Sequence, residues 1–206
     1  MALFDLFRQR RSSAPADIAQ FLQAQSAYVA QKTVLDYCRV KTGRREKEYF
    51  SNAEFLAALA HCRWQVFFAS LADVTALIEA HLRPHAVGQE ELLADRLAAL
   101  HHTALLVEQP PPEEAPSAAD ARDALPHHLA RLQAQAAYPA TRLPLLAEPV
   151  LFTTLPIHAE QRHGEGIAIR GALRFQIVTT QQELERRFDA PALAEALMQP
   201  MQHYTV

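Results

Sequence analysis

The stretch 55–82 constrains the fold most, because apolar side chains cover most of its circumference when it is drawn as a helix. A helix that is apolar on several sides is stable only when other elements surround it. Ser51 and Glu54 have the spacing of a capping box, which places the helix start directly after Ser51, and Pro84 ends the helix. We therefore predict a helix over 52–82 at the centre of the fold.

Two further helices are predicted beside this one, over 16–41 and over about 89–107. The first carries an apolar stripe at three-and-four spacing that runs from Ile18 through Tyr37 to Val40. Only 5 glycines and 8% aromatic residues accompany many Ala, Leu and Gln, a composition that favours helices over strands. The predicted fold class is mainly α: an antiparallel helical bundle followed by a smaller helical C-terminal part.

The sequence EQPPPEEAPS at 108–117 combines four prolines with three glutamates. Such a composition is typical of an extended linker. We therefore divide the chain into a basic amphipathic segment (1–13), a helical bundle (14–107), the linker (108–117) and a C-terminal helical part that packs on or beside the bundle (118–206).

The C-terminal part is interrupted by prolines and is harder to assign. A helix over 118–136 is predicted, perturbed near Pro126. The segment 166–178 fits both a strand and a helix, and we favour a helix because the continuation TTQQELERRF is strongly helical. Asp189 predicts the cap of a last helix over 190–198.

Charge and targeting signals narrow the class of protein. The chain has 206 residues and a net charge of -3, so it has no global positive field for nucleic acid. No secretory signal and no membrane-spanning stretch are recognised, which predicts a cytoplasmic protein. Cys38 and Cys62 form no CxxC pair, and we expect them to be reduced, buried thiols.

The first residues, MALFDLFRQRR, combine apolar and basic side chains. Apolar residues facing the acyl boundary and arginines facing anionic headgroups would give weak membrane contact. The alternatives are a disordered terminus and a segment that docks onto a partner protein or onto this protein's own bundle. The candidate docking residues are Leu3, Phe4, Phe7, Arg8, Arg10 and Arg11.

Signals for catalysis are weak. The 10 histidines lack the spacing of a metal site: neighbouring histidines on a helix point about 100° apart, and the single ExxH at 160–163 has no companion. Neither a GxSxG nucleophile elbow nor a glycine loop for phosphates is present. We assign no catalytic or metal-binding residue and expect no cofactor.

Charged residues near the apolar faces of the first two helices are the most specific polar feature: Asp36, Arg39, Arg63 and Asp73. An ion pair between Asp36 and Arg63 would fix how the helices pack. The alternative is a polar pocket in which Arg39 or Arg63 binds a carboxylate or phosphate beside Tyr37 and Trp64.

The strings DYCR (36–39), CRW (62–64), LPIH (155–158) and LRF (173–175) are similar to a pattern in small uncharacterised bacterial proteins. This resemblance spans most of the chain. It implies a helical fold with a basic N-terminal segment and no particular reaction.

The first functional hypothesis is a non-catalytic interaction protein, an adaptor or assembly factor with a protein partner and possible contact with an anionic membrane surface. A helical bundle that binds a small ligand or lipid is the alternative, and a hydrolytic or metal-dependent enzyme ranks last. A basic and apolar docking surface formed by Arg170, Leu173, Arg174 and Phe175 is a further alternative, although we expect Leu173 and Phe175 in the core.

Overall fold

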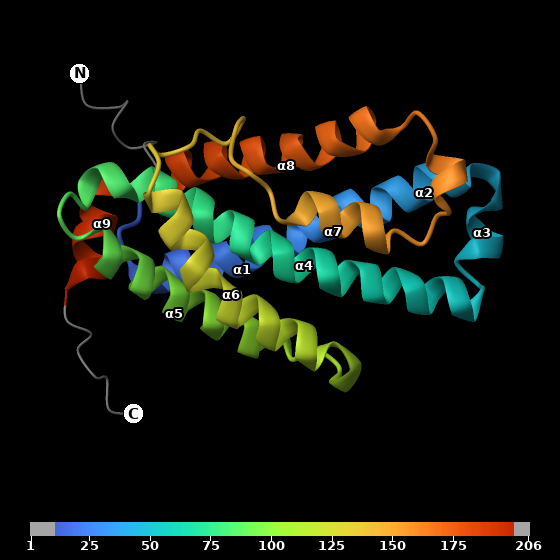
Figure 1. Ribbon diagram of the computed structural model, residues 1–206, viewed down its shortest axis with the longest axis horizontal. Coiled ribbons are helices and arrows are strands. Elements are labelled where there is room, and N and C mark those ends of the chain that lie inside the picture. The colour runs from blue at the N-terminus through green and yellow to red at the C-terminus, as the bar shows by residue number, and fades with distance from the viewer. Residues whose placement is uncertain (1–10, 200–206) are drawn as a thin grey trace, which may run out of the picture.

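The computed structural model describes residues 11–199 and has a mainly α fold, as predicted. Figure 1 shows helices running along the long axis of the molecule around α4. The α-helices are α1 (Pro15–Gln31), α2 (Tyr37–Thr42), α3 (Glu46–Tyr49), α4 (Ala53–Leu82), α5 (Glu90–Glu108), α6 (Ala115–Gln133), α7 (Ala147–Thr154), α8 (Gly166–Arg187) and α9 (Ala190–Met198).

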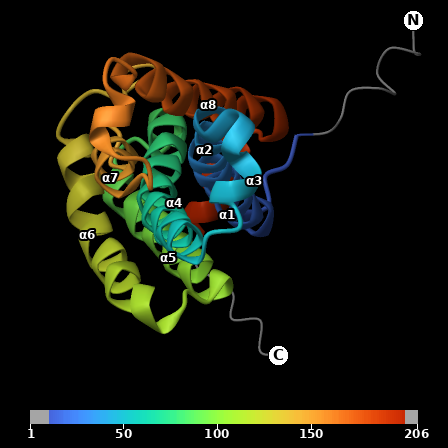
Figure 2. The same ribbon diagram turned by 90° about the vertical axis from the view of Figure 1, so that its right-hand side faces the viewer.

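Helix α4 is the centre of the fold, and its predicted extent is confirmed. The predicted capping box is wrong: Asn52 caps α4, since its side chain accepts a hydrogen bond from the backbone N–H of Phe55 at 2.9 Å, whereas the Ser51 hydroxyl donates to the Glu48 carbonyl. Every residue from Val66 to Ala80 is buried. The end-on view in Figure 2 shows why: α1, α5, α6, α7 and α8 surround it.

The central helix also has the length and composition of a membrane span, which we did not expect from the sequence. The span Ala53–His85 has a window with a mean hydropathy of 1.3, of which 50% is buried inside the protein. A core helix that packs against neighbours on several sides needs the same apolar composition.

The first predicted helix is helical from Pro15 to Thr42, but it is not a continuous α-helix. A π-helical turn, Lys32–Asp36, separates α1 from α2. Such a turn adds a residue to the register and rotates the side chains that follow it. Consequently Cys38 is fully buried, whereas Val40 is 82% exposed, so the predicted buried position of Val40 is wrong.

The proline-rich stretch 108–117 is more compact than the extended linker we predicted. Gln109 adopts a left-handed conformation, Pro112–Glu114 form a 3-10 turn, and α6 begins at Ala115. Prolines fit this arrangement because the first positions of a helix need no backbone N–H. The stretch therefore closes a tight connection between α5 and α6.

The two sides of this connection share one hydrophobic cluster in the described part of the chain. Leu71 and Leu97 belong to it together with Leu129 and Leu173. Helix α6 passes through Pro126 without ending. The division of the chain into domains stays a prediction.

The ambiguous segment 166–178 is helical, as we favoured, and forms most of α8. Leu173 and Ile177 face the core. The expected core position of Phe175 is wrong, because this side chain is 65% exposed. Two residues correspond to about 200° on a helix, so Phe175 faces away from the side that Leu173 buries.

The first described residues pair with the junction of α8 and α9. The Ser12 backbone N–H donates to the Arg187 carbonyl at 2.8 Å, and the Asp189 N–H donates to the Ser12 carbonyl at 2.9 Å. Asp189 caps α9 by accepting from the Ala192 N–H, which confirms the predicted cap. Of the predicted docking residues, Arg11 is exposed, and Leu3, Phe4, Phe7, Arg8 and Arg10 lie outside the described residues.

Candidate functional site

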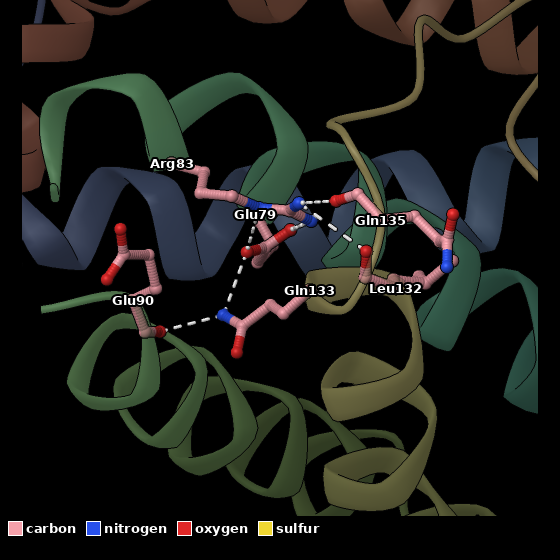
Figure 3. Close-up of polar contacts among 6 residues, drawn as sticks. All are labelled: Glu79, Arg83, Glu90, Leu132, Gln133 and Gln135. Atoms are coloured by element: carbon pink, nitrogen blue, oxygen red, sulfur yellow. Dashed lines mark hydrogen bonds and ion pairs between the residues drawn. The ribbon is translucent and has the colours of Figure 1, made fainter. Parts of the chain in front are cut away.

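A buried ion pair holds the end of α4 in place (Figure 3). The side chain of Glu79 is 0% exposed and that of Arg83 is 12% exposed. Arg83 donates through Nε at 2.8 Å and through Nη2 at 2.6 Å to the two Glu79 oxygens. Gln133 donates both to Glu79 and to the Glu90 carbonyl, so the network joins α4 and α6 to the start of α5.

The same arginine also fixes the chain that follows α6. Its Nη1 donates to the carbonyl oxygen of Gln135 at 2.7 Å and to that of Leu132 at 3.4 Å. Because every charged atom has a partner, the pair satisfies the condition for burying charge. This network has a structural role: it fastens three helices and leaves neither Glu79 oxygen free.

A second buried carboxylate, Asp73, positions α7. Its two oxygens accept the backbone N–H groups of Leu146 at 2.7 Å and Ala147 at 3.0 Å, at the start of that helix. Burial raises the pKa of Asp73 to about 7, against the opposing effect of these two hydrogen bonds. Because α7 leads directly into 155–162, Asp73 also determines where that segment lies.

A cavity of about 650 Å³ lies where α3, the first turns of α4 and the segment 155–162 meet. Part of its wall is apolar and comes from Tyr49, Phe55, Leu155 and Ile157. The last three are buried side chains. This end of the molecule, beside the labels α2 and α3 in Figure 1, therefore has a recess that is lined in part by largely buried apolar side chains.

Arg162 is the best-positioned polar group of the cavity. Its Nε donates to the Ile157 carbonyl at 2.8 Å, and its Nη1 donates to the Phe152 carbonyl at 3.0 Å. Two main-chain acceptors thus fix the plane of a partly buried guanidinium. Its Nη2 forms no hydrogen bond with the residues that the structure describes.

The rest of the polar wall is more exposed. Arg45 donates to Glu48 through two nitrogens, at 2.9 and 2.7 Å, and lies 5.0 Å from the centre of the Tyr49 ring. His158 and Glu54 line the same cavity and are exposed. The cavity therefore combines an apolar wall with charged groups of both signs.

The pocket that we predicted from Tyr37, Arg39, Arg63 and Trp64 is only partly assembled. Arg63 and Trp64 line one pocket of about 270 Å³ together with Glu108. Trp64 and Phe67 give this pocket an aromatic wall, with ring centres 5.9 Å apart, but Tyr37, the partner that we expected for Trp64, does not line it.

Tyr37 and Arg39 lie elsewhere. The Tyr37 hydroxyl donates to Glu165 at 2.6 Å, and Arg39 pairs with Glu46 at 3.5 Å with its side chain half exposed. Lys41 bonds the other oxygen of Glu165. These contacts join α2 to the start of α8 instead of completing a pocket with Arg63.

The expected ion pair between Asp36 and Arg63 is absent, because Asp36 binds Lys32 at 3.1 Å, one turn earlier. The reason is local: the pair Lys32–Asp36 has the spacing at which helical side chains meet. Arg63 is exposed and therefore needs no carboxylate partner.

The histidines do not gather into a metal site: no group of three or more His, Cys, Asp or Glu suited to a metal ion occurs among the described residues. Burial lowers the pKa of His101 to about 4, so this side chain is neutral at physiological pH. Burial also raises the pKa of Cys38 to about 12 and that of Cys62 to about 11. Thiols of this kind are poor nucleophiles.

One histidine does meet a carboxylate, and we missed it in the sequence. His61 Nδ1 lies 2.7 Å from Oε1 of Glu114, a residue only 3% exposed that we had placed in the linker. Gln65 donates to the other Glu114 oxygen at 2.7 Å and to Ser117 at 2.9 Å. This cluster anchors the start of α6 on α4.

The residues of the 650 Å³ cavity were also missed as a site. Two signals were available: the string LPIH at 155–158, and an arginine four residues after His158 in a segment between two helices. Neither indicates that this segment meets α3 and α4, about a hundred residues earlier in the chain.

Comparison of the chain with protein-family models, with curated proteins and with solved structures finds no match in any of the three. The chemistry of the site itself therefore has to indicate the function.

Proposed function

We propose that this protein binds a small amphipathic organic molecule in the cavity between α3, the start of α4 and the segment 155–162. The observation that carries the proposal is the cavity of about 650 Å³ with its mixed lining. Ligand pockets typically have volumes of roughly 300–1,000 Å³ and combine apolar walls with a few polar groups. The sequence predicted a small-ligand site at Arg63 as an alternative, and we now propose such a site at this different cavity.

The lining supports a mostly apolar ligand with one polar end. Phe55, Leu155 and Ile157 give the apolar surface, while Arg162 and His158 give polar groups in the same recess. An apolar chain gains free energy in proportion to the area it removes from water, about 25 cal/mol per Å².

The surroundings support a site that is formed before the ligand arrives. Asn52 caps the start of α4, and Asp73 holds the helix that leads into 155–162. A preformed pocket saves the entropy of ordering its walls on binding.

Binding is favoured over catalysis because no hydrogen bond from residues 11–199, the described part of the chain, orients the His158 ring as a base. General-base histidines are usually held by a carboxylate or carbonyl acceptor. The His–carboxylate contact of the described residues joins His61 to Glu114 and does not line this cavity.

The test uses octanol and octanoate as probes, and a variant that fills the cavity. Ala58 is exposed and lines the cavity, so Ala58→Trp inserts a large ring without disturbing the core. The matched control is Ala57→Trp, at the neighbouring exposed position outside the lining. A ligand that binds only the folded state raises the unfolding temperature with its concentration.

We expect at least one probe to raise the unfolding temperature of the wild type and of Ala57→Trp, and to leave that of Ala58→Trp unchanged. The proposal fails if neither probe changes the wild type, or if the two tryptophan variants respond alike.

A second candidate is a docking surface for a protein partner, the hypothesis that ranked first from the sequence. It is supported by a groove of about 350 Å³ between α5 and α6, lined by Leu105, Leu106 and Pro110 among others. Leu106 is 65% and Val107 is 56% exposed near the end of this helical hairpin. We propose that the groove accepts the apolar face of a partner's helix.

This second candidate is tested by affinity purification of a tagged chain from its native lysate. A partner that copurifies in stoichiometric amount should be lost with Leu106→Ser and retained with Ala99→Ser, a change at an exposed position of α5 outside the groove lining. Equal retention by both variants would reject the groove.

Membrane contact and a cytoplasmic location stay proposals that depend on residues 1–13 and on composition. Sedimentation with phosphatidylserine vesicles, for the full chain and for a chain lacking residues 1–13, tests the first of these. We expect binding only by the full chain, and equal sedimentation of the two would reject it.

A further inference from the structure

We infer that the ligand of the α3–α4 cavity carries an anionic group, a carboxylate or a phosphate, and that Arg162 binds this group. The inference rests on the proposed function and adds the chemical class of the ligand. Its basis is a partly buried guanidinium in the cavity wall that lacks a carboxylate partner among the described residues.

The contacts of Arg162 leave part of its hydrogen-bonding capacity unused. A guanidinium has five N–H donors. Two of its nitrogens reach the main-chain carbonyls of Ile157 and Phe152, at 2.8 and 3.0 Å. Its Nη2 has no acceptor among the described residues, so this edge of the fork is free for a ligand.

Two acids lie close to Arg162 in sequence, and neither pairs with it: Glu160, two residues earlier, is exposed and forms no ion pair with Arg162. Glu165 follows Arg162 by three residues, yet its oxygens accept from Tyr37 and Lys41. A partly buried charge without a counterion carries a desolvation cost that an anion would offset. Arginine binds carboxylates and phosphates in preference to neutral groups because its planar fork matches their oxygens.

The neighbouring groups favour an anion as well. The N-terminus of α4, 30 residues long, opens onto the cavity at Asn52 and Phe55 and contributes the positive end of the helix dipole. Arg45 is neutralised by Glu48 through two hydrogen bonds. Glu54 is therefore the remaining negative charge of the lining, and it is exposed.

Because Glu54 and Arg162 carry opposite charges in the same lining, removing each charge should change the affinity for an anion in opposite directions. Arg162→Gln removes the proposed anchor, whereas Glu54→Gln removes a charge that repels an anion. A neutral ligand of the same length is indifferent to both changes, because it offers no charge to either residue.

The experiment measures the affinity of octanoate, octyl phosphate and octanol by isothermal titration calorimetry, at low and high salt. In the wild type we expect an anion to bind at least about tenfold more tightly than octanol, the equivalent of one charge-assisted hydrogen bond. Arg162→Gln should abolish this ratio, and Glu54→Gln should raise it. Arg142→Gln, at an exposed position outside the cavity lining, should leave it unchanged.

The outcomes separate this inference from the proposed function. If octanol binds as tightly as both anions, the anion inference is rejected and the binding site stands; if none of the three binds, both are rejected. Tighter binding of octyl phosphate or of octanoate identifies the group, and either result supports the inference.

Arg162→Gln also removes two hydrogen bonds to the main chain and can unfold the segment. In that case the anion affinity of Glu54→Gln and the salt dependence of anion binding test the inference. Anion affinity that rises with Glu54→Gln and falls with salt supports the inference, and affinity indifferent to both overturns it.

Discussion

Replacing Glu79 by alanine is expected to destabilise the protein more than any surface change, because it leaves Arg83 buried without its carboxylate. The substitution removes three hydrogen bonds: two from Arg83, at 2.8 and 2.6 Å, and one from Gln133, at 2.9 Å. The guanidinium would keep only the carbonyls of Gln135 and Leu132, at 2.7 and 3.4 Å.

The expected loss is about 3–5 kcal/mol, which is typical when one partner of a buried ion pair is removed. The free energy of unfolding of a domain is roughly 5–15 kcal/mol, so this loss is a large fraction of the total stability. Urea denaturation followed by far-UV circular dichroism measures it as a change in midpoint at an unchanged slope.

The double variant Glu79→Leu, Arg83→Met separates the cost of an unpaired charge from the value of the pair. Because it buries no charge, it should be more stable than Glu79→Ala. As a control, Asp123→Ala disrupts an exposed pair with Arg122 and should leave the midpoint unchanged. A loss below about 1 kcal/mol for Glu79→Ala, or a double variant less stable than the single one, would refute this reasoning.

Three further predictions follow from buried groups and backbone geometry. Burial raises the pKa of Asp73 from 3.8 to about 7 in the folded protein, so the folded state holds a proton that the unfolded state releases. The contribution of Asp73 to stability is therefore fully present below about pH 4 and is lost as the pH rises through about 7. The unfolding free energy of the wild type relative to Asp73→Asn, measured from pH 4 to 8, should fall across this window, and a flat difference would contradict the assignment. Cys38 and Cys62, whose thiol pKa values burial raises to about 12 and 11, should react slowly with Ellman's reagent in the native protein and fast in urea; rapid native labelling would show that they are accessible. Gly171→Ala should stabilise the protein by about 0.5–1 kcal/mol, because an added Cβ in α8 meets nothing within 4 Å. Gly43→Ala should instead destabilise it by about 1–3 kcal/mol, because Gly43 has φ 50 and ψ -122, and thermal denaturation yielding the same sign for both glycines would refute the geometric argument.

Periodicity predicted the parts of the fold that depend on local burial. The apolar circumference of 55–82 identified the central helix, and Asp189 identified the cap of α9. These features are local, because a capping side chain and a buried stripe are determined within a few residues of each other.

Periodicity failed where the backbone departs from a regular α-helix. The π-helical turn Lys32–Asp36 changes the direction of every side chain after it, which exposes Val40 and turns Tyr37 toward Glu165. The extended conformation predicted for 108–117 was wrong because prolines occupy both extended linkers and the first turns of helices.

The candidate site depends on contacts that no local pattern contains. Arg63 and Trp64 share a pocket because they are neighbours on one helix. Arg162 and Phe55 share a cavity only because Asp73, fully buried on α4, fixes the start of α7 and with it the segment that follows. Tertiary placement of this kind becomes visible only in the folded chain.

An NMR titration of the isotope-labelled protein with octanoate shows whether the cavity beside α3 is a ligand site. We expect saturable amide shifts that cluster at Tyr49, Phe55, Ile157 and Arg162 and that are absent in Ala58→Trp. Shifts that cluster at Trp64 would move the ligand to the other pocket, and no saturable shifts at all would reject the site.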